Sequence, residues 1–184
     1  MGLVMRPVPL ICAIVGVVLG VALLLDGMVV VAMYSYSSDG AHYTCTTAGV
    51  SQSGNASIRD RTAGLGIMAG GLAILLSVGF IVIWVASLIL DTLNHGLPNW
   101  ILAAIMLALS LLQIASYTVA WALMAKDIND FQNTPPGTSC DTPGGWSAGI
   151  AFALFGFLGW IGMAILVVLW AVLLQFLDSG RSEG

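Results

Sequence analysis

The chain has 184 residues, of which 59% are hydrophobic and only 8% are charged. Soluble domains carry about 45–50% apolar and about 25% charged residues, so this chain lacks the polar residues needed to cover a soluble globule. Disorder is excluded too, because disordered chains combine low hydrophobicity with high charge. Five Lys and Arg against nine Asp and Glu give a net charge of −4, so no basic surface is available for nucleic-acid phosphates. The composition predicts an integral membrane protein.

Four apolar segments are long enough to cross a membrane. A spanning helix needs about 20 mostly apolar residues, because the hydrocarbon core is about 30 Å thick. The segments cover about residues 8–34, 63–90, 100–125 and 146–177. None of them has the two-residue alternation of a membrane β-strand. We therefore expect an all-α fold in which residues 1–184 form a single transmembrane domain.

The connections between these segments differ in length. The second and third segments are joined by the short stretch Asp91–Asn99, which contains the helix breakers Gly96 and Pro98. So short a turn makes its two helices antiparallel neighbours. The other two connections, residues 35–62 and 126–145, are longer and polar, and they share the opposite side of the membrane. The expected architecture is an antiparallel four-helix bundle with both termini on one side.

Basic residues give only a weak indication of orientation. Arg6 and Arg181 lie on one side, and Arg59, Arg61 and Lys126 on the other, which slightly favours cytoplasmic long loops. Arg6 also suggests an alternative for the first segment, a cleaved signal peptide. The apolar core of a signal peptide has about 7–15 residues, and this run is longer.

Cysteines and a glycosylation sequon favour the opposite orientation. Cys45 and Cys140 lie in the two long loops, where a disulfide forms in an oxidising compartment. Asn55 begins the sequon Asn-Ala-Ser in the first of these loops. We therefore expect cytoplasmic termini and a Cys45–Cys140 bridge, with Asn55 as a candidate glycosylation site. The alternatives are unpaired cysteines and a sequon that occurs by chance.

Asp26 is an ionisable residue in the first apolar segment, and such residues are functional candidates. The helix from Val8 to Asp26 is about 27 Å long at about 1.5 Å per residue. If the span begins at Val8, we expect Asp26 to lie near the outer interface, ionised and facing Arg59 or Arg61. A role in transport or proton relay is the alternative interpretation.

A polar stripe is present on the third segment, where Ser110, Gln113 and Tyr117 recur at helical spacing. Unsatisfied polar groups are costly in hydrocarbon, so this stripe is expected to face the other helices and to form hydrogen bonds with them. The alternative is that it lines a polar pore or a ligand cavity.

Glycine recurs at short intervals in three of the segments. Small residues allow membrane helices to approach closely, so these glycines are predicted to pack helices within the bundle or between molecules. The predicted positions are Gly16, Gly20, Gly66, Gly70, Gly149, Gly156, Gly159 and Gly162.

No catalytic motif is found in the sequence. His42 and His95 fall on opposite sides of the predicted membrane, and there is no zinc, nucleotide or serine-hydrolase motif. His95 with Asp91 provides only two metal ligands. We therefore predict a protein that is not an enzyme, with no catalytic residue, metal site or cofactor.

Residues 149–155 are Gly-Ile-Ala-Phe-Ala-Leu-Phe, and residues 160–164 are Trp-Ile-Gly-Met-Ala. This pattern resembles the last helix of MARVEL-domain proteins, especially the synaptogyrin and synaptophysin branch. Asp26-Gly27 is similar to the acidic-Gly ending of the first helix in that branch, and residues 66–73 are similar to the start of its second helix.

The chain also departs from that branch. Each long loop has one cysteine, whereas the branch pairs cysteines within a loop, and no long Tyr-rich tail follows the last helix. Partner binding through such a tail is therefore not implied. Claudin-like tetraspans are the nearest competitor. They carry Trp-Gly-Leu-Trp in the first loop, and residues 35–62 contain no Trp.

The resemblance implies a non-enzymatic tetraspan protein that organises membrane or vesicle proteins and lipids through lateral helix packing and outer-loop contacts. Its expected partners are membrane lipid, other membrane proteins or further copies of the chain, in vesicles, endomembranes or the plasma membrane. One alternative is an accessory subunit of a larger channel, pump or energy-transducing assembly. The other is a small transporter or channel that uses Asp26 and the polar stripe.

Overall fold

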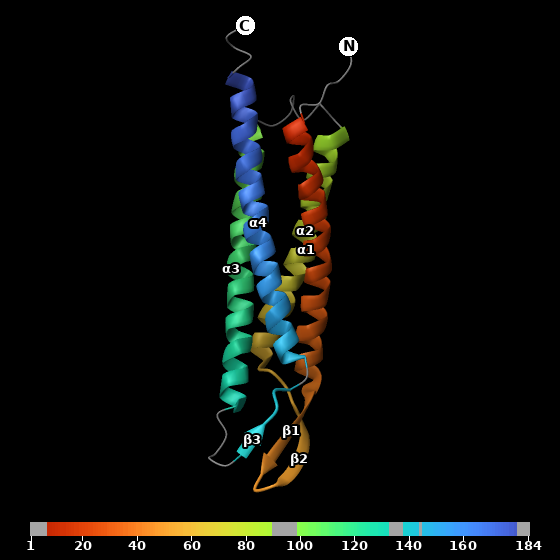
Figure 1. Cartoon of the computed structure of the whole chain (residues 1–184), viewed down its shortest axis with the longest axis vertical. Coiled ribbons are helices and arrows are strands. Elements are labelled where there is room, and N and C mark those ends of the chain that lie inside the picture. The colour runs from red at the N-terminus through yellow and green to blue at the C-terminus, as the bar shows by residue number, and fades with distance from the viewer. Residues whose placement is uncertain (1–6, 90–98, 133–137, 144, 180–184) are drawn as a thin grey trace.

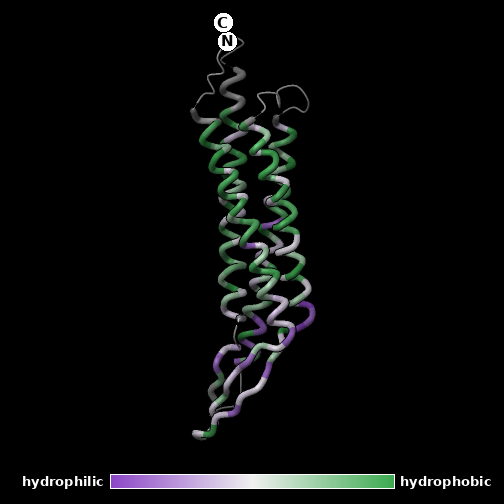
Figure 2. Tube along the Cα trace, turned by 90° about the vertical axis from the view of Figure 1, so that its right-hand side faces the viewer, coloured by the Kyte–Doolittle hydropathy of each residue, from purple (hydrophilic) through white to green (hydrophobic). Residues whose placement is uncertain are grey.

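The computed structural model describes residues 7–89, 99–132, 138–143 and 145–179, which form four long helices and a small β-sheet at one end (Figure 1). The helices are α1 (Pro7–Gly40), α2 (Asp60–Ile89), α3 (Asn99–Gln132) and α4 (Trp146–Ser179). Each contains a stretch long and apolar enough to cross a membrane. Hydrophobic residues run along the helices, and hydrophilic residues gather toward the sheet (Figure 2). These features indicate an integral multi-pass membrane protein, as predicted.

The helices extend beyond their apolar segments on the sheet side. Residues 35–40 were expected in a loop but belong to α1, and residues 126–132 likewise belong to α3. A hydropathy pattern marks where hydrocarbon ends, whereas a helix continues into water as long as its backbone hydrogen bonds are kept. Gly40 ends α1 with a φ of 107°, a conformation that glycine adopts without steric strain. The expected turn 91–98 and the prolines at 135 and 136 lie outside the described residues.

The outer connections contain a three-stranded sheet, which the all-α expectation did not include. Strand β1 (Ala41–Thr47) pairs antiparallel with β2 (Val50–Ala56), and the other edge of β1 pairs with β3 (Thr138–Cys140). The order is therefore β2-β1-β3. Both residues of the intervening turn, Ala48 and Gly49, have positive φ, as a tight hairpin turn requires. The sequence did not reveal these strands because they are polar on both faces.

Glycines mark the closest approaches between helices. At seven of the eight predicted positions, a Cβ would lie less than 3.0 Å from an atom of a neighbouring helix, and at Gly162 the nearest atom is 3.7 Å away. The contacts run in opposite order along the paired helices. They are Gly16–Trp84, Gly20–Ile81, Gly70–Val31 and Gly66–Tyr34 between α1 and α2, Gly162–Leu19 and Gly159–Leu23 between α1 and α4, and Gly149–Met124 and Gly156–Tyr117 between α3 and α4.

Aromatic rings fill the half of the bundle that is farther from the sheet. Trp84 of α2 meets Trp170 of α4 edge to face, with ring centroids 5.4 Å apart. Phe80 and Trp160 join the same two helices at 5.5 Å. All four rings are buried, so this half of the bundle has a dense apolar core.

We expect Gly66→Ala to destabilise the bundle and Gly71→Ala to leave it intact. A Cβ at Gly66 would overlap the ring of Tyr34, whereas Gly71 has nothing within 4 Å. Forced overpacking costs about 1–3 kcal/mol. At the open site the change is neutral or favourable, because alanine is the better helix former by about 1 kcal/mol. Denaturant unfolding in detergent micelles measures the difference, and equal stabilities of the two variants would contradict the packing described.

Candidate functional site: a buried carboxyl group and the outer sheet

Asp26 lies between three helices. The hydroxyl of Tyr117 on α3 donates a hydrogen bond to Asp26 Oδ2 at 2.9 Å. Gly156 of α4 faces the same place, and a Cβ there would overlap both Asp26 and the Tyr117 ring. The absence of a side chain at Gly156 therefore makes room for this carboxyl–hydroxyl pair.

The position of this pair along α3 and α4 can be compared with the interfacial position expected for Asp26. Tyr117 and Gly156 are separated from the polar residue Lys126 and from Trp146 at the start of α4 by about 13–15 Å of helix at about 1.5 Å per residue. That is close to half of a hydrocarbon core about 30 Å thick. The interfacial position of Asp26 stays a prediction, since it was counted from an assumed start of the span at Val8.

Arg59, which was expected to face Asp26, contacts acidic residues of α3 instead. Its guanidinium lies 3.5 Å from Asp127 and 2.6 Å from Asp130, and its backbone N–H donates to Asp127 Oδ2 at 3.2 Å. The Asp127 side chain is only 5% exposed. This cluster joins the chain just before α2 to the last turns of α3. Arg61, the other expected partner, is exposed at the start of α2.

The polar stripe of α3 is fully buried and faces different neighbours at each turn. Gln113 donates its Nε2 to the backbone carbonyl of Ala69 on α2 at 2.6 Å. Ser110, which was expected to bond to another helix, donates instead to the carbonyl of Met106 within its own helix at 2.9 Å. Tyr117 bonds across to Asp26. Two buried oxygens near this stripe, Asp26 Oδ1 and Gln113 Oε1, have no hydrogen-bond partner among the described residues.

Basic residues are distant from Asp26 in the described part of the chain. Arg59, Arg61 and Lys126 all belong to the sheet end of the bundle. A carboxylate in a low-dielectric interior is costly when no opposite charge compensates it. The arrangement therefore suits either a protonated carboxylic acid or a carboxylate that holds a cation.

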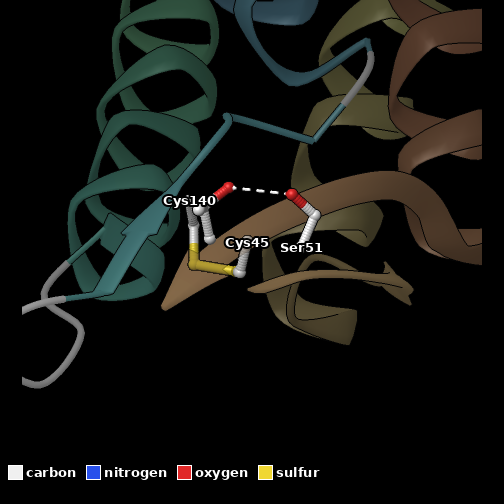
Figure 3. The surroundings of a disulfide bond; sticks show 4 residues. Cys45, Ser51 and Cys140 are labelled. Atoms are coloured by element: carbon white, nitrogen blue, oxygen red, sulfur yellow. Dashed lines mark hydrogen bonds between the residues drawn. A yellow bond between two sulfur atoms is a disulfide. The ribbon is translucent and has the colours of Figure 1, made fainter. Parts of the chain in front are cut away.

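The sheet connects the two outer loops covalently. Cys45 of β1 and Cys140 of β3 are register partners and form the predicted disulfide (Figure 3). Beside the bridge, the hydroxyl oxygens of Thr46 and Ser51 are 3.3 Å apart and link β1 to β2 (Figure 3). Cys12 is a free, buried cysteine of α1. The α1–α2 and α3–α4 connections therefore form one outer unit.

Aromatic contacts attach this unit to the helices. Tyr43 of β1 packs edge to face on Phe131 of α3, with centroids 5.0 Å apart, and Phe131 packs on Trp146 of α4 at 5.6 Å. Phe131 and Asp127 were not predicted from the sequence, because residues 126–145 were expected to form a loop. Asn55 is exposed on β2 opposite His42, so the predicted glycan site is accessible.

Metal ligands do not gather in the described ranges, where no group of three or more His, Cys, Asp or Glu residues is placed to hold a metal ion. His95 and Asp91, the two ligands considered from the sequence, lie outside those ranges.

Comparison with protein-family models, with curated proteins and with solved structures finds no match for this chain. The resemblance to MARVEL-domain proteins therefore stays a prediction that rests on the sequence motifs.

Replacing Tyr117 with Phe is expected to destabilise the bundle by about 1–3 kcal/mol, because it leaves the half-buried Asp26 carboxyl without its donor. The same substitution in an Asp26→Leu background should have much less effect, since no carboxyl then remains to be satisfied. Denaturant unfolding of the four proteins in detergent measures this coupling. Equal effects of Tyr117→Phe in both backgrounds would mean that the hydrogen bond contributes no stability.

Proposed function

We propose that this chain is a non-enzymatic tetraspan protein, similar to MARVEL proteins, that organises membrane or vesicle proteins and lipids by lateral association. In this proposal the four helices form an antiparallel bundle with both termini in the cytoplasm. The reversed order of contacts along α1–α2, α1–α4 and α3–α4 supports the antiparallel arrangement. The disulfide and the exposed sequon support placing the sheet outside the cytoplasm, in an oxidising compartment.

The outward face of α2 is the observation that carries this proposal. Most helical glycines pack against a neighbouring helix of the bundle. A Cβ placed on Gly64, Gly71 or Gly79, by contrast, would have nothing within 4 Å. Met68 and Leu75 lie between them and Val82 follows Gly79, and these three side chains are 70%, 72% and 61% exposed. We call these six residues the α2 face. Residues spaced by three or four positions share one side of a helix, so the α2 face combines small and large apolar residues in one stripe.

Such a stripe suits contact with another transmembrane helix. Lipid tails do not drive helices together, and association depends on close van der Waals packing at small residues. The glycines predicted from the sequence are occupied by contacts inside the bundle, so the α2 face, rather than those positions, is proposed for lateral contact. Its occupant in this proposal is a further copy of the chain or a helix of another membrane protein.

Disulfide crosslinking in native membranes tests this contact. In a Cys12→Ala background, we expect Leu75→Cys on the α2 face to give a defined crosslinked band under mild oxidation. Leu158→Cys on α4 is the matched control, because its side chain is also outward-facing at 62% exposure. Adding Gly71→Leu should remove the band by preventing close approach. Equal crosslinking at both positions, or none at either, would contradict lateral association through α2.

A second candidate function, a small proton or cation transporter, is favoured by one observation. Asp26 Oδ1 is buried without a hydrogen-bond partner, and the basic residues of the described chain lie at the sheet end. Ionisable groups in membrane spans often mark ion pathways. If Asp26 carries such a pathway, purified protein in liposomes will conduct, and Asp26→Asn will abolish the flux while preserving shape and hydrogen bonding. Absence of flux in the wild type excludes this candidate.

A further inference from the structure

We propose that the open edge of β2 pairs with β2 of a second copy in a facing membrane, so that the protein joins two membranes. This inference deepens the proposed function, because it names a partner for the outer sheet and relies on the sheet lying outside the cytoplasm. It uses a different part of the molecule from the α2 face.

Strand β2 is an open edge of the sheet. The order β2-β1-β3 leaves one side of β2 without a strand among the described residues. Natural proteins protect such edges with Lys, Pro, bulges or very short strands. Residues 50–56 contain neither a charge nor a Pro, and their register with β1 is unbroken over seven pairs. The opposite edge, β3, is only three residues long.

The free hydrogen-bonding groups of this edge can be assigned. Thr47 and Val50 flank the two-residue turn and form the first hydrogen-bonded pair of the hairpin. In an antiparallel ladder, hydrogen-bonded and non-hydrogen-bonded pairs alternate. Ser51, Ser53 and Asn55 therefore direct their N–H and C=O groups away from β1. They present a regular set of donors and acceptors to an incoming strand.

A second copy of β2 fits this edge. Residues 50–56 carry no charge, so two copies bring no like charges together. Antiparallel pairing is the more stable arrangement per residue. If the two β2 strands pair antiparallel with their Ser53 residues opposite each other, the pair is two-fold symmetric. The same contact then satisfies the free backbone groups of both strands, as an isologous interface does.

The direction of the strands determines where the second molecule lies. Figures 1 and 2 both show the hairpin extending beyond the helices along the long axis of the bundle. Strand β2 runs from the hairpin turn back toward the helices. In an antiparallel pair the second β2 runs the other way, so its bundle lies at the opposite end. The two bundles then point away from each other and belong to facing membranes, whereas a pair in one membrane would need parallel strands.

Vesicle tethering tests this geometry. The parent protein is the full-length chain with Asn55→Gln, which removes a glycan from the same edge. It is reconstituted into two liposome populations with different fluorophores. Protease accessibility gives the fraction of molecules with the sheet outside, and fluorescence cross-correlation measures tethering. Non-reducing electrophoresis checks that each variant keeps the Cys45–Cys140 bridge and is folded.

Substitutions at Ser53 separate edge pairing from other contacts. Ser53→Ala keeps the backbone N–H, so it should tether like the parent. Ser53→Pro removes an N–H that does not serve β1, and tethering should fall to the level of protein-free liposomes. Ser53→Lys and Ser53→Asp place like charges opposite each other, so each should fail alone. Mixing liposomes that carry Ser53→Lys with liposomes that carry Ser53→Asp should restore tethering, because opposite charges then meet across the strand pair.

Two results would overturn the inference. One is a parent protein that does not tether liposomes. This result counts against the inference even if the β2 strands associate within a single membrane. The other is tethering that Ser53→Pro and the charge substitutions leave unchanged. Crosslinking through α2 without tethering would leave the proposed lateral function standing, and tethering without α2 crosslinking would remove lateral association but retain edge pairing.

Discussion

Close packing of side chains against glycines holds this bundle together, because lipid provides no hydrophobic force between helices. The ring of Tyr34 lies where a side chain on Gly66 would be, and the indole of Trp84 occupies the same kind of space beside Gly16. Each such contact fixes the rotation and the height of one helix against another. The positions of the buried polar groups and of the sheet follow from these fixed helices. A helical glycine at which a Cβ would meet nothing within 4 Å, such as Gly71, is therefore an exception.

The Asp26–Tyr117 pair shows how packing places a polar group. Gly156 leaves space for both side chains, and the depth of that space determines how far the carboxyl lies from water. A hydrogen bond in a low-dielectric interior is stronger than in water, and an unpaired group there is costlier. The same site therefore combines a hydrogen-bonded oxygen, Oδ2, with an oxygen, Oδ1, that has no partner among the described residues.

Hydropathy predicted the four membrane-crossing segments well, because lipid requires long apolar helices. Cysteine position likewise predicted the bridge between the outer loops. Hydropathy failed where water replaces lipid. Residues 35–40 continue α1 as a polar stretch of helix, and residues 50–56 of β2 are mostly exposed. Neither segment therefore has an apolar pattern from which it could be predicted. The partner of Asp26 was also misjudged, since its carboxyl contacts Tyr117 of α3, whereas Arg59 pairs with Asp127 and Asp130.

The Cys45–Cys140 bond has a consequence for how the chain enters the membrane. It closes a covalent ring that contains α2 and α3, with the two cysteines 95 residues apart. Both sulfurs reach the same compartment only after the second and third helices have both crossed and Cys140 has been delivered to the side of Cys45. Oxidation of this pair thus records the completed passage of α2 and α3, and a chain in which one of these helices has not crossed keeps free thiols by which it can be distinguished.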